Sequence, residues 1–176
     1  MRPELFWVPT PLPGRLAVAP RPRGGDWLDD EMAAWRQAGV DVVVSLLTPG
    51  EAEEFDLEGE ADAAERAGLR FRAFPVVDRD VPASRAGFRG VVGEIAAELG
   101  EGRGVVVHCR QGIGRAGLVA GGVLIAAGSG PGDAVERLTA ARGRVVPETP
   151  AQRRWLDEFA NETLAAGTGV PEGHKG

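Results

Sequence analysis

The sequence of 176 residues has one cysteine, no tyrosine and one lysine, and two of these shortages have consequences for function. A single cysteine cannot form an internal disulfide, which excludes the framework of a small secreted protein, so we expect a cytoplasmic location. Because lysine is nearly absent, arginine carries nearly all of the positive charge. Two neighbouring arginines are therefore weak evidence of a site by themselves.

Basic charge and long apolar runs are also scarce. The net charge of −6 argues against a general nucleic-acid binder. No run approaches the roughly 18 apolar residues that span a bilayer, and the N-terminus lacks the apolar stretch of a signal peptide, so we expect no membrane partner.

The composition fits one globular domain, which we assign to residues 1–165 and expect to be a monomer. Residues 166–176 are polar and rich in glycine, and are predicted to form a flexible C-terminal tail.

Segments with the pattern of strands alternate with segments that have the spacing of helices. The runs Leu5–Val8 and Leu16–Ala19 are predicted to be edge strands, and the apolar run Val40–Leu47 a buried central strand. Another strand is predicted at Leu69–Val77, and Thr48 begins a capping box with Glu51. Helices are predicted at about 26–38, 57–67, 84–99, 114–127, 131–142 and from 149 onward. The alternation predicts an α/β fold with a mainly parallel central sheet and helices on both faces.

The segment His108–Arg115 carries the strongest chemical signal, because it joins a short apolar strand to a helix that is apolar on nearly all sides. Gly112 and Gly114 let consecutive backbone N–H groups turn toward one anion, and the helix N-terminus adds its partial positive charge. Arg115 can bind two phosphate oxygens, and the same positive field favours the thiolate of Cys109. The alternative interpretation is that Cys109 is only a small buried residue at the end of a strand, without a chemical role. The conjunction of these features favours a phosphate site with a nucleophile.

These residues resemble the signature of the protein-tyrosine and dual-specificity phosphatases, His-Cys-x5-Arg followed by Ser or Thr. The segment Phe74–Pro82 is similar to the acid loop of the small kinase-associated-phosphatase-like branch. The resemblance extends from the strand at Val42 to the final helix, and it implies the protein-tyrosine-phosphatase-like fold. It implies a phosphorylated protein or a small phosphoester as substrate, with phosphotyrosine or phosphoserine/threonine as the first choice. It implies no cofactor and no metal.

By this resemblance Cys109 is the nucleophile that forms a phosphocysteine intermediate, and Arg115 binds the phosphate and stabilises the transition state. His108 helps to set the thiolate. Asp78 matches the position of the general acid that protonates the leaving oxygen, and Asp80 is the alternative. Both could instead be solvated turn residues beside Pro82.

The other site residues lie in the loop and near the last helix. Gln152 resembles the glutamine that positions the hydrolytic water, but Thr149-x-x-Gln152 is equally a capping box. Ala116 departs from the family, whose Ser or Thr helps the cysteine sulfur to leave, and this predicts a slow second step. The residues expected to bind substrate or to shape the pocket are Arg110, Gln111, Gly112, Ile113 and Gly114.

Three functions from different classes fit these residues. The first is a phosphomonoester hydrolase. The second is a pseudophosphatase, an interaction module that binds phosphate without turnover; Ala116 favours it, whereas the presence of Cys109, Arg115 and Asp78 disfavours it. The third is a rhodanese-like sulfur transferase, which Arg115 and Asp78 disfavour because sulfur transfer needs no acid on a distant loop.

Overall fold

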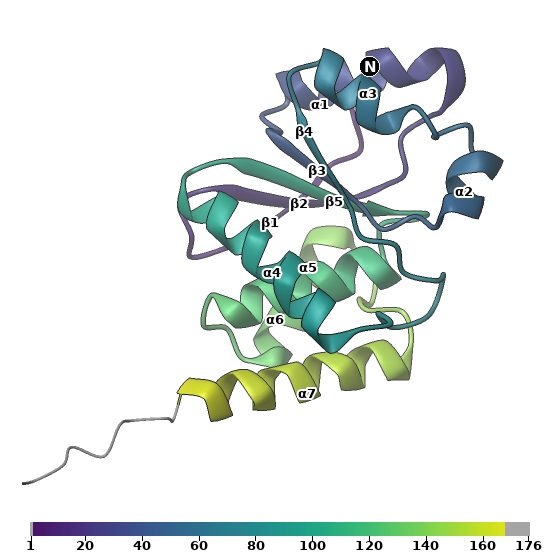
Figure 1. Cartoon of the computed structure of the whole chain (residues 1–176). Helices are drawn as coiled ribbons and strands as arrows, with labels where there is room; N and C mark the ends of the chain where they lie inside the picture. The colour runs from purple at the N-terminus through teal and green to yellow at the C-terminus, as the bar shows by residue number, and fades with distance from the viewer. Residues whose placement is uncertain (1, 168–176) are drawn as a thin grey trace, which may run out of the picture.

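The computed structural model describes residues 2–167, which form a five-stranded sheet with helices on both faces (Figure 1). The strands are β1 (Phe6–Val8), β2 (Arg15–Pro20), β3 (Val42–Ser45), β4 (Arg70–Ala73) and β5 (Gly104–Cys109). The helices are η1 (Gly25–Trp27), α1 (Leu28–Gln37), α2 (Pro49–Glu54), α3 (Glu60–Arg66), α4 (Arg85–Gly100), α5 (Gly114–Ala126), α6 (Pro131–Arg142) and α7 (Pro150–Gly167). The strand order is β1-β2-β5-β3-β4, and only β1 is antiparallel to its neighbour. The predicted α/β fold is confirmed.

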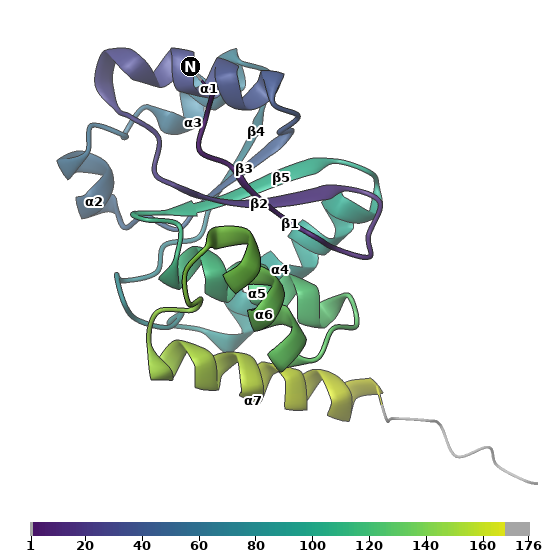
Figure 2. The same ribbon diagram turned by 180° about the vertical axis from the view of Figure 1, so that it is seen from behind.

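The two faces of the sheet carry different helices, as Figures 1 and 2 show from opposite sides. Helices α1 and α3 cover one face, and α4, α5, α6 and α7 cover the other. Helix α5 lies in the middle of the thicker layer, and every residue from Gly114 to Ile125 is buried. This burial explains why the helix is apolar on all sides.

Strand β5 is the centre of the sheet, and its six residues are all buried. Successive side chains of a strand point to opposite faces. Val105, Val107 and Cys109 therefore belong to the core under α5, whereas Val106 packs under α1 and α3. The same alternation places Cys109 on the α5 side and His108 on the other.

One expectation about strand position is wrong. The segment Leu16–Ala19, predicted to be an edge strand, lies in β2, which is hydrogen-bonded to β1 on one side and to β5 on the other. The run Val40–Leu47, predicted to be a buried central strand, contains β3, which is fully buried and paired on both sides, between β5 and β4. An apolar run shows that a strand is covered on both faces, but it does not show its place in the order.

Helix boundaries follow their local signals closely. The Thr48 capping box is present and starts α2. Helix α7 continues to Gly167, so residues 166 and 167 of the predicted tail are helical, and residues 168–176 lie outside the described part. Within the described residues, no helix is both long enough and apolar enough to cross a membrane.

The parallel strands β2, β3, β4 and β5 all end at the same edge of the sheet. In open α/β sheets, ligands bind in the crevice outside these carboxyl ends. The loop after Cys109, the start of α2 and the loop containing Asp78 follow β5, β3 and β4 respectively. The sheet therefore brings the loop after Cys109 and the loop containing Asp78 to one edge, together with the start of α2.

Candidate active site

Cys109 is the last residue of β5 and lines a small pocket at the carboxyl edge of the sheet. The side chain is almost fully buried, with 3% of its surface exposed. The pocket has a volume of about 130 Å³, whereas sites for drug-sized ligands measure about 300–1,000 Å³. It has room for one phosphate group. Its lining residues are Asp78, Arg79, Cys109, Arg110, Gln111, Gly114, Arg115 and Glu148.

Two glycines let the chain turn from β5 into α5. Gly112 has a φ of +71°, and a Cβ at this position would lie 2.5 Å from the backbone carbon of Ala19. A Cβ on Gly114 would lie 3.0 Å from a carboxylate oxygen of Glu148 and 3.1 Å from the amide atoms of Gln152. Glycine is therefore needed for the loop to lie against β2 and against the start of α7.

The backbone N–H groups of residues 110–113 find no acceptor within residues 2–167. Free N–H groups just before a helix form an anion-binding concavity.

Arg142 contacts two carbonyl groups of this loop from outside it. It donates from Nη2 to Gln111 O at 3.0 Å and from Nε to Gly112 O at 3.3 Å. Burial lowers the pKa of Arg142, and the charge of Arg144 lowers it further. The sequence analysis missed Arg142, because no local pattern marks a contact made from the end of α6.

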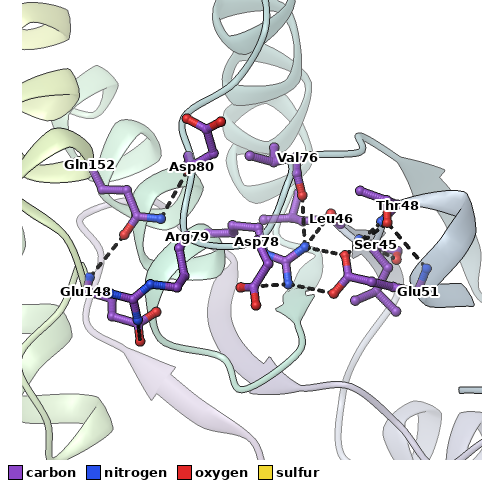
Figure 3. A network of polar contacts seen from close by, with 12 residues as sticks. Ser45, Leu46, Thr48, Glu51, Val76, Asp78, Arg79, Asp80, Glu148 and Gln152 are labelled. Carbon is purple, nitrogen blue, oxygen red and sulfur yellow. Dashed lines mark hydrogen bonds and ion pairs between the residues drawn. The ribbon is translucent and has the colours of Figure 1, made fainter. Parts of the chain in front are cut away.

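Arg115 has only 1% of its surface exposed, and its guanidinium is held at one end. Nη1 donates to the carbonyl groups of Val76 at 2.8 Å and Leu46 at 3.4 Å. The carboxylate of Glu51 accepts from Nη1 at 2.7 Å and from Nη2 at 2.9 Å, and Asp78 Oδ1 lies 3.2 Å from Nη2 (Figure 3). The buried Nε has no partner among the described residues. On the edge formed by Nε and Nη2, Nε is therefore free to bind an oxyanion, whereas Nη2 is already in contact with Glu51 and Asp78.

Glu51 joins the start of α2 to this site, a connection that the sequence analysis missed. The backbone N–H of Thr48 donates to Glu51 Oε1 at 3.1 Å, and the same oxygen accepts from Arg115. Burial alone would raise the pKa of Glu51, but the hydrogen bonds from Arg115 and Thr48 hold it below its ordinary value. The capping box thus also holds the arginine that faces the pocket.

We expect Glu51→Gln to lower the free energy of unfolding by about 3 kcal/mol at pH 7, because it leaves a buried guanidinium with only a half-exposed carboxylate, Asp78, as partner. Since the folded pKa of Glu51 lies below the ordinary value of 4.5, its contribution is complete above that pH and is lost as the pH falls through the folded value. Urea unfolding should therefore show a difference between wild type and variant that shrinks from pH 7 to about pH 3.

The matched control is Glu54→Gln, on an exposed residue of the same helix. It should change the free energy of unfolding by less than about 0.5 kcal/mol. Equal losses in the two variants, or a Glu51→Gln effect that is undiminished at the lower pH, would contradict the assignment.

The structure separates the two candidate acids. Asp78 lines the pocket, is 45% exposed and forms the ion pair with Arg115. Asp80 Oδ1 accepts from the backbone N–H of Val81 at 2.7 Å, and Figure 3 shows its carboxylate turned away from Asp78. Of the two, Asp78 is the one that lines the pocket of Cys109, and its role as the acid remains a prediction.

Gln152 is fully buried and forms the capping box that was one of its two predicted roles. Its Oε1 accepts from the backbone N–H groups of Thr149 and Glu148, both at 3.2 Å, and its own N–H donates to Thr149 Oγ1 at 3.2 Å. Its Nε2 also donates to the carbonyl of Asp80 at 3.1 Å (Figure 3). Gln152 therefore connects the loop that contains Asp78 and Asp80 to the start of α7. Its other predicted role, to position the hydrolytic water, stays a prediction.

Glu148 is a pocket residue that the sequence analysis missed. Its carboxylate would repel a bound phosphate, but Arg79 Nη1 lies 2.8 Å from Glu148 Oε1 and offsets the charge. Arg79 has a φ of +63°, in the left-handed region that non-glycine residues seldom adopt. This ion pair is a second contact between the loop that contains Asp78 and the segment just before α7.

His108 lies on the opposite face of the sheet from Cys109. Its Nε2 is 2.5 Å from Glu60 Oε1, and its ring centroid is 5.7 Å from that of Trp35. Its backbone carbonyl accepts from the N–H of Leu46 at 3.0 Å. The imidazole therefore fixes the end of β5 against α3, and any effect on the thiolate must pass through the backbone. That role remains a prediction.

Comparison with known proteins identifies relatives of this site and fold. The family model "Polymorphic toxin system, DSP-PTPase phosphatase" matches residues 18–129. Cyclin-dependent kinase inhibitor 3 of Rattus norvegicus is 26% identical over 132 residues, which cover 74% of this chain. The match spans 62% of that relative's own length, which is less than two thirds.

Solved structures share the fold over nearly the whole chain. Kinase associated phosphatase, with its catalytic-site cysteine replaced by serine, has a TM-score of 0.84 at 20% identity, covering 94% of this chain and 98% of that one. Tk-PTP in its active form has a TM-score of 0.74 at 25% identity, covering 92% and 99%. PTPMT1 in complex with PI(5)P has a TM-score of 0.72 at 20% identity, again covering 92% and 99%.

Proposed function

Because this chain belongs to the DSP-PTPase phosphatase family of polymorphic toxin systems, we propose that it hydrolyses phosphate monoesters through a covalent intermediate on Cys109. The observation that carries the proposal is the buried Nε of Arg115, a charged donor without a partner in the described residues. A buried unpaired donor is costly, and a phosphate oxygen would satisfy it. The pocket beside it is lined by the only cysteine of the chain.

The proposed first step is attack of the Cys109 thiolate on phosphorus, which forms an S–P bond as the bond to the leaving oxygen breaks. Asp78 gives its proton to that oxygen. The free Nε of Arg115 and the N–H groups of residues 110–113 bind the phosphoryl oxygens and stabilise their charge in the transition state. The loop residues Arg110, Gln111, Gly112, Ile113 and Gly114 form the phosphate cradle in this mechanism.

In the second step water attacks phosphorus, the S–P bond breaks and the thiolate is restored. The Asp78 carboxylate, now deprotonated, takes the proton of the water. Gln152 lies against Gly114 and next to the acid loop, and to hold this water it would have to turn its amide away from Thr149, Glu148 and Asp80. Ala116 offers no hydroxyl to the departing sulfur, so we propose that the second step limits turnover.

The substrate that we propose first is a phosphorylated protein, at phosphotyrosine or at phosphoserine/threonine. The small pocket supports this, because it receives a phosphate group rather than the whole substrate. A small phosphoester is the alternative, and the complex of PTPMT1 with PI(5)P shows that one protein of this fold binds a phosphoinositide. We propose that the chain acts as a monomer in the cytoplasm, since a single cysteine requires no oxidising compartment.

A pseudophosphatase that binds phosphate with little turnover is the second candidate. Ala116 is the observation that favours it, because a phosphorylated Cys109 that is not hydrolysed would stop the cycle. The pocket and its cradle would serve binding equally well. The two candidates differ in whether product is released repeatedly.

A burst assay with para-nitrophenyl phosphate, without added metal, tests the proposal. We expect a rapid burst of nitrophenol approaching one equivalent of enzyme, followed by slow steady turnover. Ala116→Ser should leave the burst unchanged and raise the steady rate about tenfold, because the new hydroxyl can donate to the departing sulfur.

The control is Ala126→Ser, at an exposed residue of the same helix, which should change neither phase. If folded protein that binds inorganic phosphate releases no nitrophenol between about pH 4 and pH 8, the hydrolase proposal fails and the binding module replaces it.

A further inference from the structure

Two arginines that follow different strands meet over one aromatic ring beside the candidate active site. The guanidinium carbon of Arg21 lies 3.9 Å from the ring centroid of Phe55, and that of Arg110 lies 5.2 Å from it. Arg21 follows β2, Arg110 follows Cys109, and Phe55 follows α2. The backbone N–H of Arg21 also donates to the carbonyl of Arg110 at 3.3 Å. The two arginines are therefore fixed relative to each other by backbone and side-chain contacts.

Neither arginine is neutralised by a carboxylate. Across residues 2–167, no Asp or Glu oxygen lies within 4.0 Å of the guanidinium nitrogens of Arg21 or Arg110, whereas nearby Arg23 is paired with Glu31 and Arg79 with Glu148. The whole chain carries a net charge of −6. Two adjacent unpaired guanidiniums in an acidic protein form a local positive field that attracts anions.

Each of these arginines lines a different cavity. Arg110 lines the pocket of Cys109, and Arg21 lines a second cavity of about 600 Å³ between the chain after β2 and helix α1. Their shared contact with the Phe55 ring places a lining residue of one cavity beside a lining residue of the other. The acidic residues of the larger cavity, Glu4, Asp30 and Glu31, share it with Arg2, Arg21 and Arg23. Glu31 is already paired with Arg23, so Arg21 keeps its charge beside the larger cavity and Arg110 keeps its charge beside the pocket of Cys109.

We propose that Arg21 and Arg110 form a second anion subsite, which binds a second phosphate group of a small bisphosphorylated substrate while the first lies against Cys109. The inference rests on the proposed function of the Cys109 pocket, and it takes the small phosphoester, the alternative substrate given there, in place of a phosphorylated protein. A guanidinium held by stacking on a ring is already ordered, so it loses less conformational freedom when it binds an anion. The larger cavity has the size of a small-molecule site and can receive the body of the substrate.

The test is calorimetric binding of alkane-1,n-bisphosphonates of three to eight carbons, each compared with the monophosphonate of the same chain length. These probes are not hydrolysed, so the result does not depend on turnover. We expect at least one chain length at which the bisphosphonate binds about tenfold more tightly than its monophosphonate. Arg21→Gln should reduce this preference to less than about threefold and should change the affinity for the monophosphonate by less than about twofold.

The matched control is Arg15→Gln, at the opposite end of β2. Arg15 also stacks on an aromatic ring, 3.8 Å above Trp7, and also has no carboxylate within 4.0 Å in residues 2–167. This variant changes the net charge equally and should keep the full preference. No preference at any chain length, a preference that survives Arg21→Gln, or an equal loss in Arg15→Gln would overturn the subsite.

The subsite and the proposed function can fail separately. If bisphosphonates bind more tightly through Arg21 but para-nitrophenyl phosphate is not turned over, the subsite stands and the hydrolase does not. If the ester is turned over without any preference for bisphosphonates, the hydrolase stands and the subsite does not. A preference seen only with doubly phosphorylated peptides would overturn the assignment to a small molecule.

Discussion

Cys109→Ser is expected to abolish turnover of para-nitrophenyl phosphate, with a fall in kcat of at least about 10⁴-fold. Serine keeps the shape of the pocket floor, so the loss isolates the chemistry of the sulfur. A hydroxyl is a weak nucleophile unless a neighbouring base takes its proton. The imidazole of His108 lies on the other face of the sheet beside Glu60 and cannot do this. The burst and the steady phase of nitrophenol release should disappear together.

The same variant should still bind inorganic phosphate, because the free Nε of Arg115 and the N–H groups of the loop are unchanged. Phosphate should therefore raise the Tm of Cys109→Ser as it raises that of wild type. This stabilisation shows that the variant is folded with its cradle intact. Turnover above about a hundredth of the wild-type rate in a preparation free of wild-type enzyme would contradict a covalent role for Cys109.

The elements of the fold could be predicted where a local pattern determines them. The capping box at Thr48, the apolar β5 and the uniformly apolar α5 each have a signature within a few residues, and each is found where the pattern places it. The order of strands has no such signature. Hydrogen bonds between β2 and β5 join segments that are far apart in the chain, and a short apolar segment looks alike at the second and the last position of a sheet.

The residues of the candidate site also differ in whether a local pattern could predict them. The loop from Cys109 to Arg115 is contiguous, so its spacing could be recognised. Glu51, Arg142 and Glu148 reach the loop from three other segments, and no spacing rule connects them to it. The position of His108 follows from strand alternation, because adjacent residues of β5 must face opposite ways. The preference for Asp78 over Asp80 as the candidate acid rests on the fold of the loop itself, in which Asp78 lines the pocket and Asp80 accepts a hydrogen bond from the N–H of Val81.

Asp78→Asn is expected to lower the burst rate of nitrophenol release from para-nitrophenyl phosphate by about 10²–10³-fold, the usual contribution of a general acid. Asparagine keeps the size of the side chain, and Glu51 continues to hold Arg115, so the phosphate site should survive. The burst reports the first step alone, in which the leaving oxygen takes the proton, so it separates this loss from the slower second step.

Two comparisons distinguish the loss of a proton donor from damage to the loop. One uses a series of substrates with different leaving groups, and the other makes the same substitution at the neighbouring Asp80. A phenol of high acidity leaves without help, so the effect of Asp78→Asn on the burst rate should shrink steadily along a series of aryl phosphates with more acidic phenols. Asp80→Asn, which only weakens a hydrogen bond to Val81, should change the burst rate less than about threefold. If Asp78→Asn lowers the burst rate equally for every leaving group, Asp78 holds Arg115 in position and the proton must come from elsewhere.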